Sequence, residues 1–163
     1  MNNLTIIAAV GNRNELGYKN QLLCHLPADL KYFKEKTMGS PVIMGDVTWA
    51  SLPKKPLPNR RNIVMTLDKS ARFEGCEVVY SVKEALEAVK NEQEAFIMGG
   101  ATIYKLFINI ATKLYLTHIH ADFEADVFFP NIDDNRWKLV ESIFREKDDK
   151  NIYNLDFQTF ILK

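Results

Sequence analysis

Three short segments of this chain are apolar at nearly every position, and they constrain the fold more than any other feature. Thr5–Val10, Pro41–Gly45 and Ala95–Met98 read TIIAAV, PVIMG and AFIM. A strand with one face in water alternates apolar and polar residues, whereas a run without that alternation is typical of a strand buried on both faces. Strands of this kind occur in parallel sheets that helices cover on both sides. The segments therefore predict an α/β fold.

Further strands and helices alternate along the rest of the chain. Pro27 predicts a helix start, since proline is tolerated at the first helical position, and Ser81 with Glu84 forms a capping box for a helix that runs to about Asn91. The other predicted elements are strands at Asn62–Met65, Glu77–Tyr80 and Lys113–Ala121, helices at Asp46–Leu52 and Ala101–Ile108, and a hairpin of Trp137–Lys147 with Asn151–Lys163. We therefore expect one α/β domain over residues 1–163, with a mostly parallel central sheet of about eight strands, flanking helices and a C-terminal antiparallel hairpin. The segment from Gly11 to His25 is expected to be a long loop.

The charge balance and the N-terminal segment argue against several classes of protein. Lys and Arg together number 21, as do Asp and Glu, so the formal net charge is zero and no nucleic-acid partner is expected. Met1–Leu4 has no positive region before its apolar run, and no apolar run reaches membrane-spanning length, so we expect neither a targeting signal nor a membrane span. Cys24 and Cys76 form no CxxC pair and are expected to be free thiols in a reducing cytoplasm.

Ligands on such sheets bind at the carboxyl ends of the strands. Those ends are followed here by the loop after Val10, the helix after Gly45, the Gly99-Gly100 turn and the end of the Lys113 strand. The two glycines allow a ligand to approach the backbone, and the helix that follows offers free N–H groups to an anion; the alternative is a plain tight turn. Neither G-x-G-x-x-G nor a Walker A loop is present.

One carboxylate lies among apolar positions of the helix that begins at Pro27. Helical spacing brings Leu26, Asp29, Leu30 and Phe33 to one face. A charged group among apolar neighbours loses water, which perturbs its pKa and favours a functional role. The alternative is that Asp29 only decorates the first turn, where acids are stabilised by the helix dipole.

Other candidate residues each have a structural alternative. Arg60 lies in a proline-stiffened loop and suits a carboxylate ligand, or it is a solvated loop charge. Thr117 could hydrogen-bond a neighbouring carboxylate, or it is simply a good strand former. His118 and His120 share a strand face, but no third ligand with sensible spacing is evident and no metal site is expected. Ser51 has no histidine partner placed by the sequence, so no serine nucleophile is expected.

The ordered set of motifs resembles the dihydrofolate reductase family of the monomeric bacterial type. The resemblance spans nearly the whole chain and rests on these residues: Ile7-Ala8-Ala9, Gly17 and Asn20, Leu26-Pro27-Ala28-Asp29-Leu30 with Phe33, Pro41–Gly45 with Thr48-Trp49 and Ser51-Leu52, Pro56-Leu57-Pro58 with Arg60 and Asn62, Gly99-Gly100 with Tyr104, Leu114–Ile119, and Asp126 with Phe129-Pro130.

This resemblance implies an NADPH-dependent reduction of 7,8-dihydrofolate to 5,6,7,8-tetrahydrofolate. Hydride would pass to C6 of the pterin, and Asp29 would assist protonation of N5, with Thr117 and Leu22 completing the catalytic group. The resemblance further implies a cytoplasmic monomer of one-carbon metabolism and a target of antifolate inhibitors. The substrate contacts would come from Ile7, Ala9, Asp29, Phe33, Leu52, Leu57, Arg60, Met98, Tyr104 and Thr117.

The same resemblance implies the cofactor site and a lid formed by the loop from Gly11 to Leu23. NADPH would be held by Ala9, Leu16, Asn20, Gly45, Asp46, Val47, Thr48, Thr66, Leu67, Ser81, Met98, Gly99, Gly100, Ala101, Thr102, Ile103 and Tyr104. Several positions depart from the usual family pattern: Leu23 and Cys24 replace a Pro-Trp pair, Asp46 replaces a basic residue, and Ala101-Thr102 replace a glycine and an arginine. Two alternatives stay open, namely a pyrimidine reductase of riboflavin synthesis with the same fold and a non-catalytic folate- or nucleotide-binding module.

Overall fold

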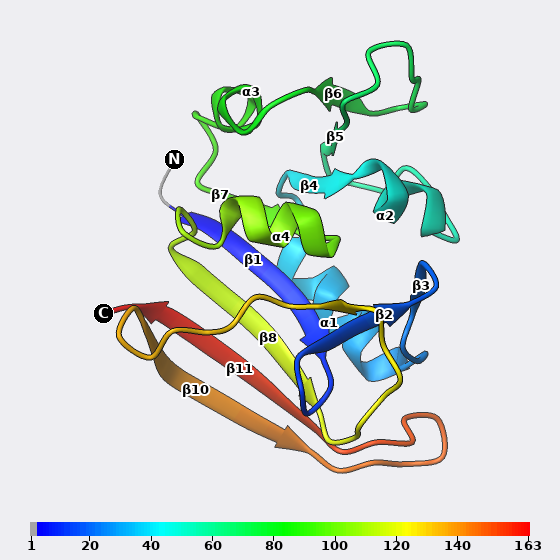
Figure 1. Ribbon diagram of the computed structural model, residues 1–163, viewed down its shortest axis with the longest axis vertical. Helices are drawn as coiled ribbons and strands as arrows, with labels where there is room; N and C mark the ends of the chain where they lie inside the picture. The colour runs from blue at the N-terminus through cyan, green and yellow to red at the C-terminus, as the bar shows by residue number, and fades with distance from the viewer. Residues whose placement is uncertain (1–2) are drawn as a thin grey trace.

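An eight-stranded sheet runs through the computed structural model, which describes residues 3–163 (Figure 1). Its strand order is β10-β11-β8-β1-β7-β4-β5-β6. Met1 and Asn2, which belong to the segment where no targeting signal is expected, lie outside the described residues. The strands of this sheet are β1 (Asn3–Val10), β4 (Val42–Gly45), β5 (Asn62–Met65), β6 (Glu77–Val79), β7 (Glu94–Ile97), β8 (Lys113–Ile119), β10 (Trp137–Arg145) and β11 (Leu155–Leu162).

The sheet is parallel except at one edge. Strands β8, β1, β7, β4, β5 and β6 pair in parallel, whereas β11 pairs antiparallel with both β8 and β10. The carboxyl ends of the parallel strands therefore meet at one edge of the sheet. The predicted α/β fold, with its mostly parallel sheet and C-terminal hairpin, is confirmed.

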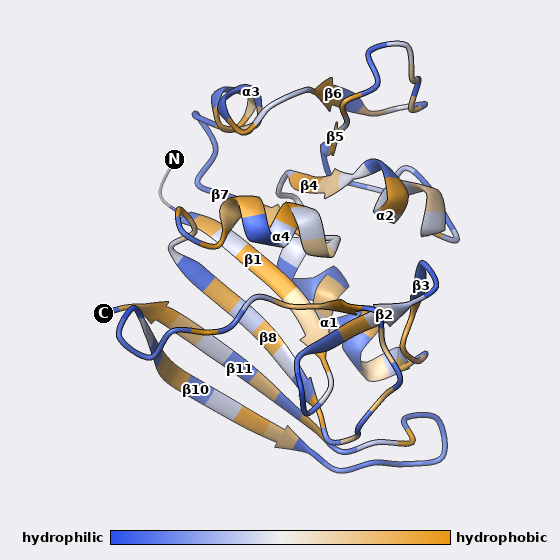
Figure 2. Cartoon of the chain, viewed as in Figure 1, coloured by the Kyte–Doolittle hydropathy of each residue, from blue (hydrophilic) through white to orange (hydrophobic). Residues whose placement is uncertain are grey.

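Helices cover both faces of the sheet because each strand side carries apolar residues. One buried cluster joins β1 to α3 (Val82–Ala88) and α4 (Ala101–Phe107), with Phe107 fully buried and Ile6 on β1. Clusters on the opposite face join the sheet to α1 (Pro27–Thr37) and α2 (Asp46–Ser51). Central strands such as β1 and β4 are accordingly apolar along their length, while β8, β10 and β11 alternate in hydropathy (Figure 2).

A second, three-stranded sheet was not predicted. Strands β2 (Glu15–Tyr18), β3 (Gln21–Leu22) and β9 (Val127–Phe128) pair in the order β3-β2-β9. β2 and β3 lie within the predicted loop from Gly11 to His25, whereas β9 follows β8. These strands are two to four residues long, too short for a hydrophobic period to be visible.

Several element ends also differ from prediction, each for a local reason. The helix that Ser81 caps ends at Ala88 and not near Asn91, because the chain tightens at Val89, whose N–H donates to Leu86. β8 ends at Ile119, where the N–H of Ala121 turns back to the Ile119 carbonyl. The hairpin arms are shorter than predicted, and α2 and α4 each end one residue early. No helix in the described part of the chain is long and apolar enough to cross a membrane.

Candidate active site

Asp29 and Thr117 meet where helix α1 crosses strand β8. The Thr117 hydroxyl donates a hydrogen bond of 2.7 Å to Oδ1 of Asp29. Asp29 lies in the first turn of α1, which begins at Pro27, and Thr117 is buried on β8 in register with Ala9 of β1. Within residues 3–163 this hydroxyl is the one group that donates a hydrogen bond to the carboxylate. A carboxylate needs more partners than one, so Asp29 keeps hydrogen-bonding capacity for a ligand.

The surroundings of Asp29 favour its protonated form. Burial raises the pKa of Asp29 above the ordinary value of an aspartate, and the hydrogen bond from Thr117 opposes that rise only in part. Burial, with a smaller contribution from the Asp29 charge, raises the pKa of the Cys24 thiol to about 11 and also raises the pKa of Tyr104. Cys24 and Cys76 are both free, as predicted, and Cys24 is a thiol of low reactivity.

An apolar wall lies on the α1 side of the sheet. It contains five residues predicted to contact a substrate, which come from β1, α1, the ends of α2 and β7, and the proline-rich loop: Ile7, Phe33, Leu52, Leu57 and Met98. Phe33 is one helical turn beyond Asp29, so both point to the same side of α1. The predicted apolar face of α1 is correct for Leu26, which is buried, but Leu30 remains 46% exposed.

Arg60 lies beside this wall without an acidic partner. Its Nε donates to the Pro58 carbonyl at 2.9 Å and its Nη1 to the Thr37 hydroxyl at 3.0 Å. The guanidinium lies 6.0 Å from the centre of the Phe33 ring. Among the described residues no carboxylate pairs with it, and burial lowers its pKa. Arg60 is therefore a half-buried cation, held in place by two hydrogen bonds, that can bind an anionic group.

The glycines at the ends of β4 and β7 lie against each other. The N–H of Gly45 donates to the Gly99 carbonyl at 2.9 Å. A Cβ atom at Gly100 would lie 3.4 Å from the Thr48 hydroxyl, and one at Gly45 would lie 3.0 Å from the Ile103 side chain. Side chains at the two glycines would therefore fill the space between α2 and α4. The peptide bond between Gly99 and Gly100 is cis, and Gly99 has a φ of +117°, a region that favours glycine.

Tyr104 fixes one side of this glycine pair. Its hydroxyl donates a buried hydrogen bond of 2.7 Å to the Ile7 carbonyl, and a Cβ at Gly99 would lie 3.3 Å from that hydroxyl. Tyr104 therefore contacts both Gly99, which follows β7, and Ile7 on β1.

Asp46 and Ser81 are held by partners within the chain. The Thr66 hydroxyl donates to Oδ2 of Asp46 at 2.8 Å, which ties the start of α2 to the end of β5. The Ser81 hydroxyl accepts the N–H of Glu84 at 3.0 Å as the cap of α3. The acid that replaces a basic residue at position 46 therefore has a structural partner.

The structure does not gather the remaining predicted residues around Asp29; most lie toward the surface, whereas Leu16 packs against the core. Leu67 is 94% exposed and Leu22, on β3, is 76% exposed. Leu16 and Asn20 lie on or beside β2, where Asn20 has a φ of +62° in the turn to β3. Val47, Ala101 and Thr102 lie in the first turns of α2 and α4.

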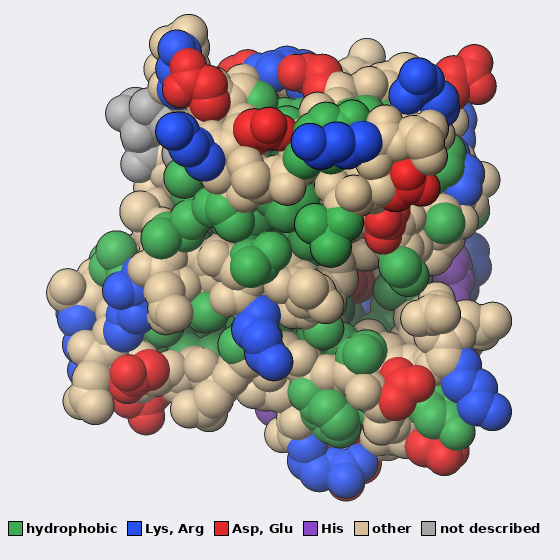
Figure 3. Space-filling model, turned by 45° about the horizontal axis from the view of Figure 1, so that its top comes forward, with side chains coloured by type: hydrophobic (Ala, Val, Ile, Leu, Met, Phe, Trp, Pro, Cys, Tyr) green, Lys and Arg blue, Asp and Glu red, His purple; other side chains and the backbone are tan. Residues whose placement is uncertain are grey.

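Hydrophobic side chains gather across the middle of the face shown in Figure 3, and most charged side chains lie toward its edges.

Glu15 is a buried acid that the sequence analysis missed. It is fully buried, and its carboxylate accepts hydrogen bonds from the backbone N–H groups of Arg13 and Phe123, the latter at 2.7 Å. Its sequence neighbours Asn14 and Leu16 gave no apolar period that could have located it. The one available signal was a lone acid within an otherwise uncharged stretch from Asn14 to Tyr18.

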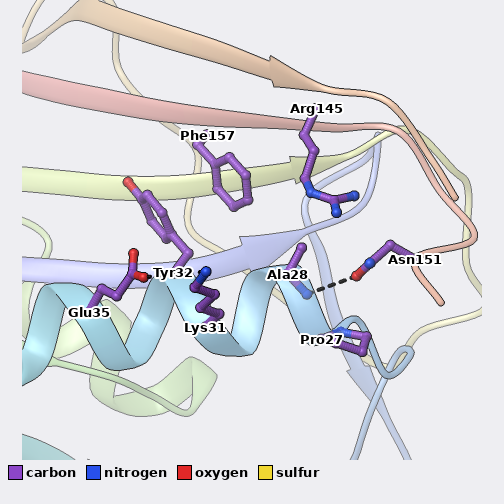
Figure 4. Close-up of a pocket in the computed structure, with 8 residues that line it drawn as sticks. All are labelled: Pro27, Ala28, Lys31, Tyr32, Glu35, Arg145, Asn151 and Phe157. Carbon is purple, nitrogen blue, oxygen red and sulfur yellow. Dashed lines mark hydrogen bonds and ion pairs between the residues drawn. The ribbon is translucent and has the colours of Figure 1, made fainter.

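One cavity lies away from this site. It has a volume of about 390 Å³ between α1 and β11, and no predicted site residue lines it (Figure 4). Tyr32 stacks on Phe157 at 4.4 Å within it, and the N–H of Ala28 donates to the Asn151 side chain at 2.8 Å. We place the site at Asp29 and not at this cavity, because several of the predicted site residues come together around Asp29 and none lines the cavity.

Comparisons with known proteins agree on one family. A sequence model described as dihydrofolate reductase matches residues 3–162. Dihydrofolate reductase of Bacillus subtilis is 43% identical over 154 residues, which cover 94% of this chain and 91% of the relative. Dihydrofolate reductase of Neisseria gonorrhoeae is 42% identical over 91% of this chain and 92% of its own. The solved dihydrofolate reductase from Enterococcus faecalis, complexed with NADP(H) and RAB-propyl, superposes with a TM-score of 0.93 at 37% identity and covers 98% of this chain and 96% of its own.

Proposed function

The chain belongs to the dihydrofolate reductase family, and from that premise we propose that it reduces 7,8-dihydrofolate to 5,6,7,8-tetrahydrofolate with NADPH, within one domain over residues 1–163. The family, the class of NADP-dependent enzyme and the cofactor that the sequence predicted are confirmed by this membership. The finer proposal concerns what individual residues do. It is carried by one observation, the hydrogen bond between Thr117 and a half-buried Asp29 beside an apolar wall.

Asp29 is proposed to bind and polarise the pterin. Its second carboxylate oxygen has no donor among residues 3–163, so it can accept hydrogen bonds from the 2-amino group and a ring nitrogen of the substrate. A carboxylate whose charge is poorly solvated raises the proton affinity of a ring bound against it. Asp29 therefore assists protonation at N5, with Thr117 holding the carboxylate in position.

The substrate is proposed to lie along the apolar wall. Phe33, Leu52 and Leu57 would hold the ring and the benzoyl group, while Ile7 and Ala9 would offer backbone contacts. The unpaired guanidinium of Arg60 suits the α-carboxylate of the glutamate tail, because an arginine fork matches a carboxylate.

The residues at the ends of β4 and β7 fit the cofactor. Gly45 and Gly100 let α4 and α2 approach the ends of the two strands closely, and the Thr48 hydroxyl lies against Gly100, where it could bind a phosphate. No side chain caps α2 or α4, so their first N–H groups are free to donate to phosphate oxygens. NADPH, when bound, supplies the hydride that C6 of the pterin receives.

The rest of the predicted cofactor group would surround these glycines. Met98, Ile103 and Tyr104 would line the nicotinamide end, and the buried Thr66 would act beside Asp46. The outer part of the cofactor would be contacted by Asp46, Val47, Leu67, Ser81, Ala101 and Thr102. The small sheet of β2, β3 and β9 would act as the lid that excludes water, with Leu16, Asn20 and Leu22 facing the bound ligands.

The wider context is also proposed. Free thiols at Cys24 and Cys76 fit a reducing compartment, and we propose a cytoplasmic monomer that acts in one-carbon metabolism, responds to antifolates and takes no nucleic-acid partner. A pyrimidine reductase with this fold would need neither Asp29 beside Thr117 nor an unpaired Arg60, and a binding module would not consume NADPH.

The test is NADPH absorbance in the presence of 7,8-dihydrofolate, comparing the wild type with Asp29→Asn and Glu35→Gln. Glu35→Gln is the matched control, because it neutralises an exposed acid on the same helix. We expect wild-type and Glu35→Gln protein to consume NADPH at similar rates and Asp29→Asn to be strongly impaired near neutral pH. Full turnover by Asp29→Asn contradicts the role of Asp29, and a wild type that consumes no NADPH supports a binding module.

A further inference from the structure

His118, His120 and Asp156 form a cluster on the face of the sheet opposite to Asp29. Side chains alternate between the two faces along a strand. Thr117 points toward α1 and bonds Asp29, so His118 points to the other face and His120, two residues on, follows it. Phe157 stacks on Tyr32 of α1, so Asp156 likewise points away from α1. The cluster is therefore separate from the site proposed for substrate and cofactor.

The pairing of β8 with β11 supplies the third member, which the sequence did not reveal. Asp156 lies in register with His118 across the antiparallel pair, although 36 residues separate it from His120 in the chain. Nε2 of His120 lies 2.7 Å from Oδ2 of Asp156, and Nδ1 of His118 lies 3.8 Å from the same oxygen. One ligand atom from each residue lies within 4.8 Å of the others, the one such group of three among residues 3–163.

Asn12 fixes the ring of His118 in the form a metal requires. Its side-chain oxygen lies 2.8 Å from Nε2 of His118, so that nitrogen carries the proton and donates it. The other nitrogen, Nδ1, then presents a lone pair toward the carboxylate of Asp156. Histidines that bind metals characteristically donate their second ring nitrogen to an oxygen acceptor in this way.

The lone pair on Nδ1 of His118 lies 3.8 Å from Oδ2 of Asp156, so a cation between the two atoms could bind both. Within the described residues no Lys or Arg forms an ion pair with Asp156; its charged-group contacts are the two histidines. Donor atoms around a four-coordinate zinc ion lie about 3.3 Å apart, given bonds of about 2.0–2.2 Å. The separations of 2.7 and 3.8 Å bracket that value. At 2.7 Å the Nε2–H of His120 donates a hydrogen bond to Asp156, and an ion bound by the two groups would take the place of that proton.

We propose that His118, His120 and Asp156 bind a divalent transition metal ion, with Zn²⁺ as the best match, and that Asn12 positions His118 for it. Two imidazoles with one carboxylate suit Zn²⁺ and its neighbours in the first transition row, whereas Mg²⁺ and Ca²⁺ prefer oxygen ligands alone. His120 is 37% exposed at its side chain, so the ion can enter from solvent and keep a water ligand. A cavity of about 220 Å³ that Asn12 and His118 help to line adjoins the cluster.

The bound ion would join β8 to β11 beyond their backbone hydrogen bonds. β11 is the strand by which the C-terminal hairpin attaches to the parallel sheet, and the two strands lie side by side along their length (Figure 1). An ion that binds only the folded protein stabilises it by RT ln(1 + c/Kd), where c is the free ion concentration, and this rises with the logarithm of c once c exceeds Kd. Zinc would therefore raise the melting temperature of the wild type.

The test is isothermal titration of ZnCl₂ alone into protein that has been treated with EDTA and then freed of chelator. We expect the wild type to bind one equivalent saturably, and His120→Ala and Asp156→Asn to lose that binding. Asn12→Ala should weaken it by about 10- to 100-fold, the effect typical of a lost outer partner. His25→Ala is the matched control, because it removes the third, exposed histidine and should leave the binding unchanged.

Two further readouts separate this site from its alternatives. The wild-type melting temperature should rise with ZnCl₂ and that of His120→Ala should not, while the two proteins melt alike in EDTA; His118→Asn replaces His120→Ala if the latter does not fold. Co²⁺ in place of Zn²⁺ should give a visible spectrum without a thiolate charge-transfer band. Absence of saturable binding, equal loss in His25→Ala, or a thiolate band from Cys24 overturns the proposal.

Discussion

Asp29 and Glu15 are both carboxylates removed from water, yet their surroundings shift the two pKa values in opposite directions. Burial raises the pKa of Asp29, and one hydroxyl only partly offsets it. Burial would also raise the pKa of Glu15, but backbone N–H groups, that of Phe123 foremost, and the Arg13 guanidinium together lower it. Asp29 receives one hydrogen bond from a side chain, whereas Glu15 receives two from backbone N–H groups and lies beside the Arg13 guanidinium.

Glu15 uses its carboxylate to hold the chain together. It links the connection after β1 to the loop at Phe123 that precedes β9, so it anchors the small sheet to the large one. Gly11 is part of the same packing, because a Cβ there would lie 2.8 Å from Oε2 of Glu15. A carboxylate with its donors supplied by the fold is structural, whereas one with an unused oxygen is available to a ligand.

The largest expected effect is on turnover. Asp29→Asn should lower kcat by about 10²- to 10⁴-fold near neutral pH, since that is the usual contribution of a positioned acid–base group. Glu15→Gln should lower kcat per folded molecule by less than about tenfold, because the residue touches no proposed ligand. Steady-state kinetics on both variants checks this. Equal losses would show that the two carboxylates do not divide into a functional and a structural one.

The second effect is on stability, where Glu15→Gln should have the larger effect and Asp29→Asn the smaller. Glu15→Gln should lower the free energy of unfolding by about 2–3 kcal/mol, because an amide NH₂ would face a backbone N–H and charge-assisted hydrogen bonds would be lost. Asp29→Asn should leave stability unchanged or raise it, since it removes a poorly solvated charge and keeps the oxygen that Thr117 bonds. Urea denaturation near neutral pH measures both. A larger loss for Asp29→Asn than for Glu15→Gln would contradict the assignment.

A smaller effect is expected when Asp29 loses its hydrogen bond from Thr117. Thr117→Val keeps the shape but removes the one donor to Asp29, so the pKa of Asp29 should rise further. The inflection that Asp29 contributes to the pH profile of kcat/KM should move to higher pH, with kcat lowered by roughly tenfold, the value of one hydrogen bond to a charged group. An unshifted profile with reduced kcat would mean that Thr117 acts only through packing.

The smallest expected effect is on how the free energy of unfolding changes with pH, which should have opposite signs for the two carboxylates. The folded state binds the Asp29 proton more tightly than the unfolded chain does, so the contribution of Asp29 falls as pH rises from the ordinary aspartate pKa through the raised one. Glu15 does the reverse: its contribution is complete above the ordinary glutamate pKa and is lost as pH falls through the lowered one. Denaturation across the acid range, with each variant subtracted from the wild type, should give slopes of opposite sign. Slopes of the same sign would refute the comparison.

The sequence predicted the parts of the fold that local chemistry determines. Apolar runs such as Thr5–Val10 located the central strands, and Pro27 located the start of α1. The cap at Ser81 was correct because its hydrogen bond to Glu84 spans only three residues. Arg60 and Asp29 were singled out from their local contrast with apolar or proline-rich neighbours.

What the sequence could not supply depends on contacts between distant residues. β2 pairs with β9 more than 100 residues away, and Glu15 is satisfied by the equally distant Phe123. Asp156 joins the histidines only because β11 returns antiparallel to β8. The register that brings these groups together is a property of the whole sheet, and no local period reports it.

The alternation along β8 has a consequence for how this strand can change. Thr117 serves the carboxylate on one face and His118 the cluster on the other, so two sites depend on adjacent residues. A deletion of one residue before them would exchange the faces, directing the His118 imidazole at Asp29 and placing Ile119 opposite Asp156. A change in the length of β8 therefore disturbs both sites at once, whereas a substitution at one of these positions disturbs only the site on its own face.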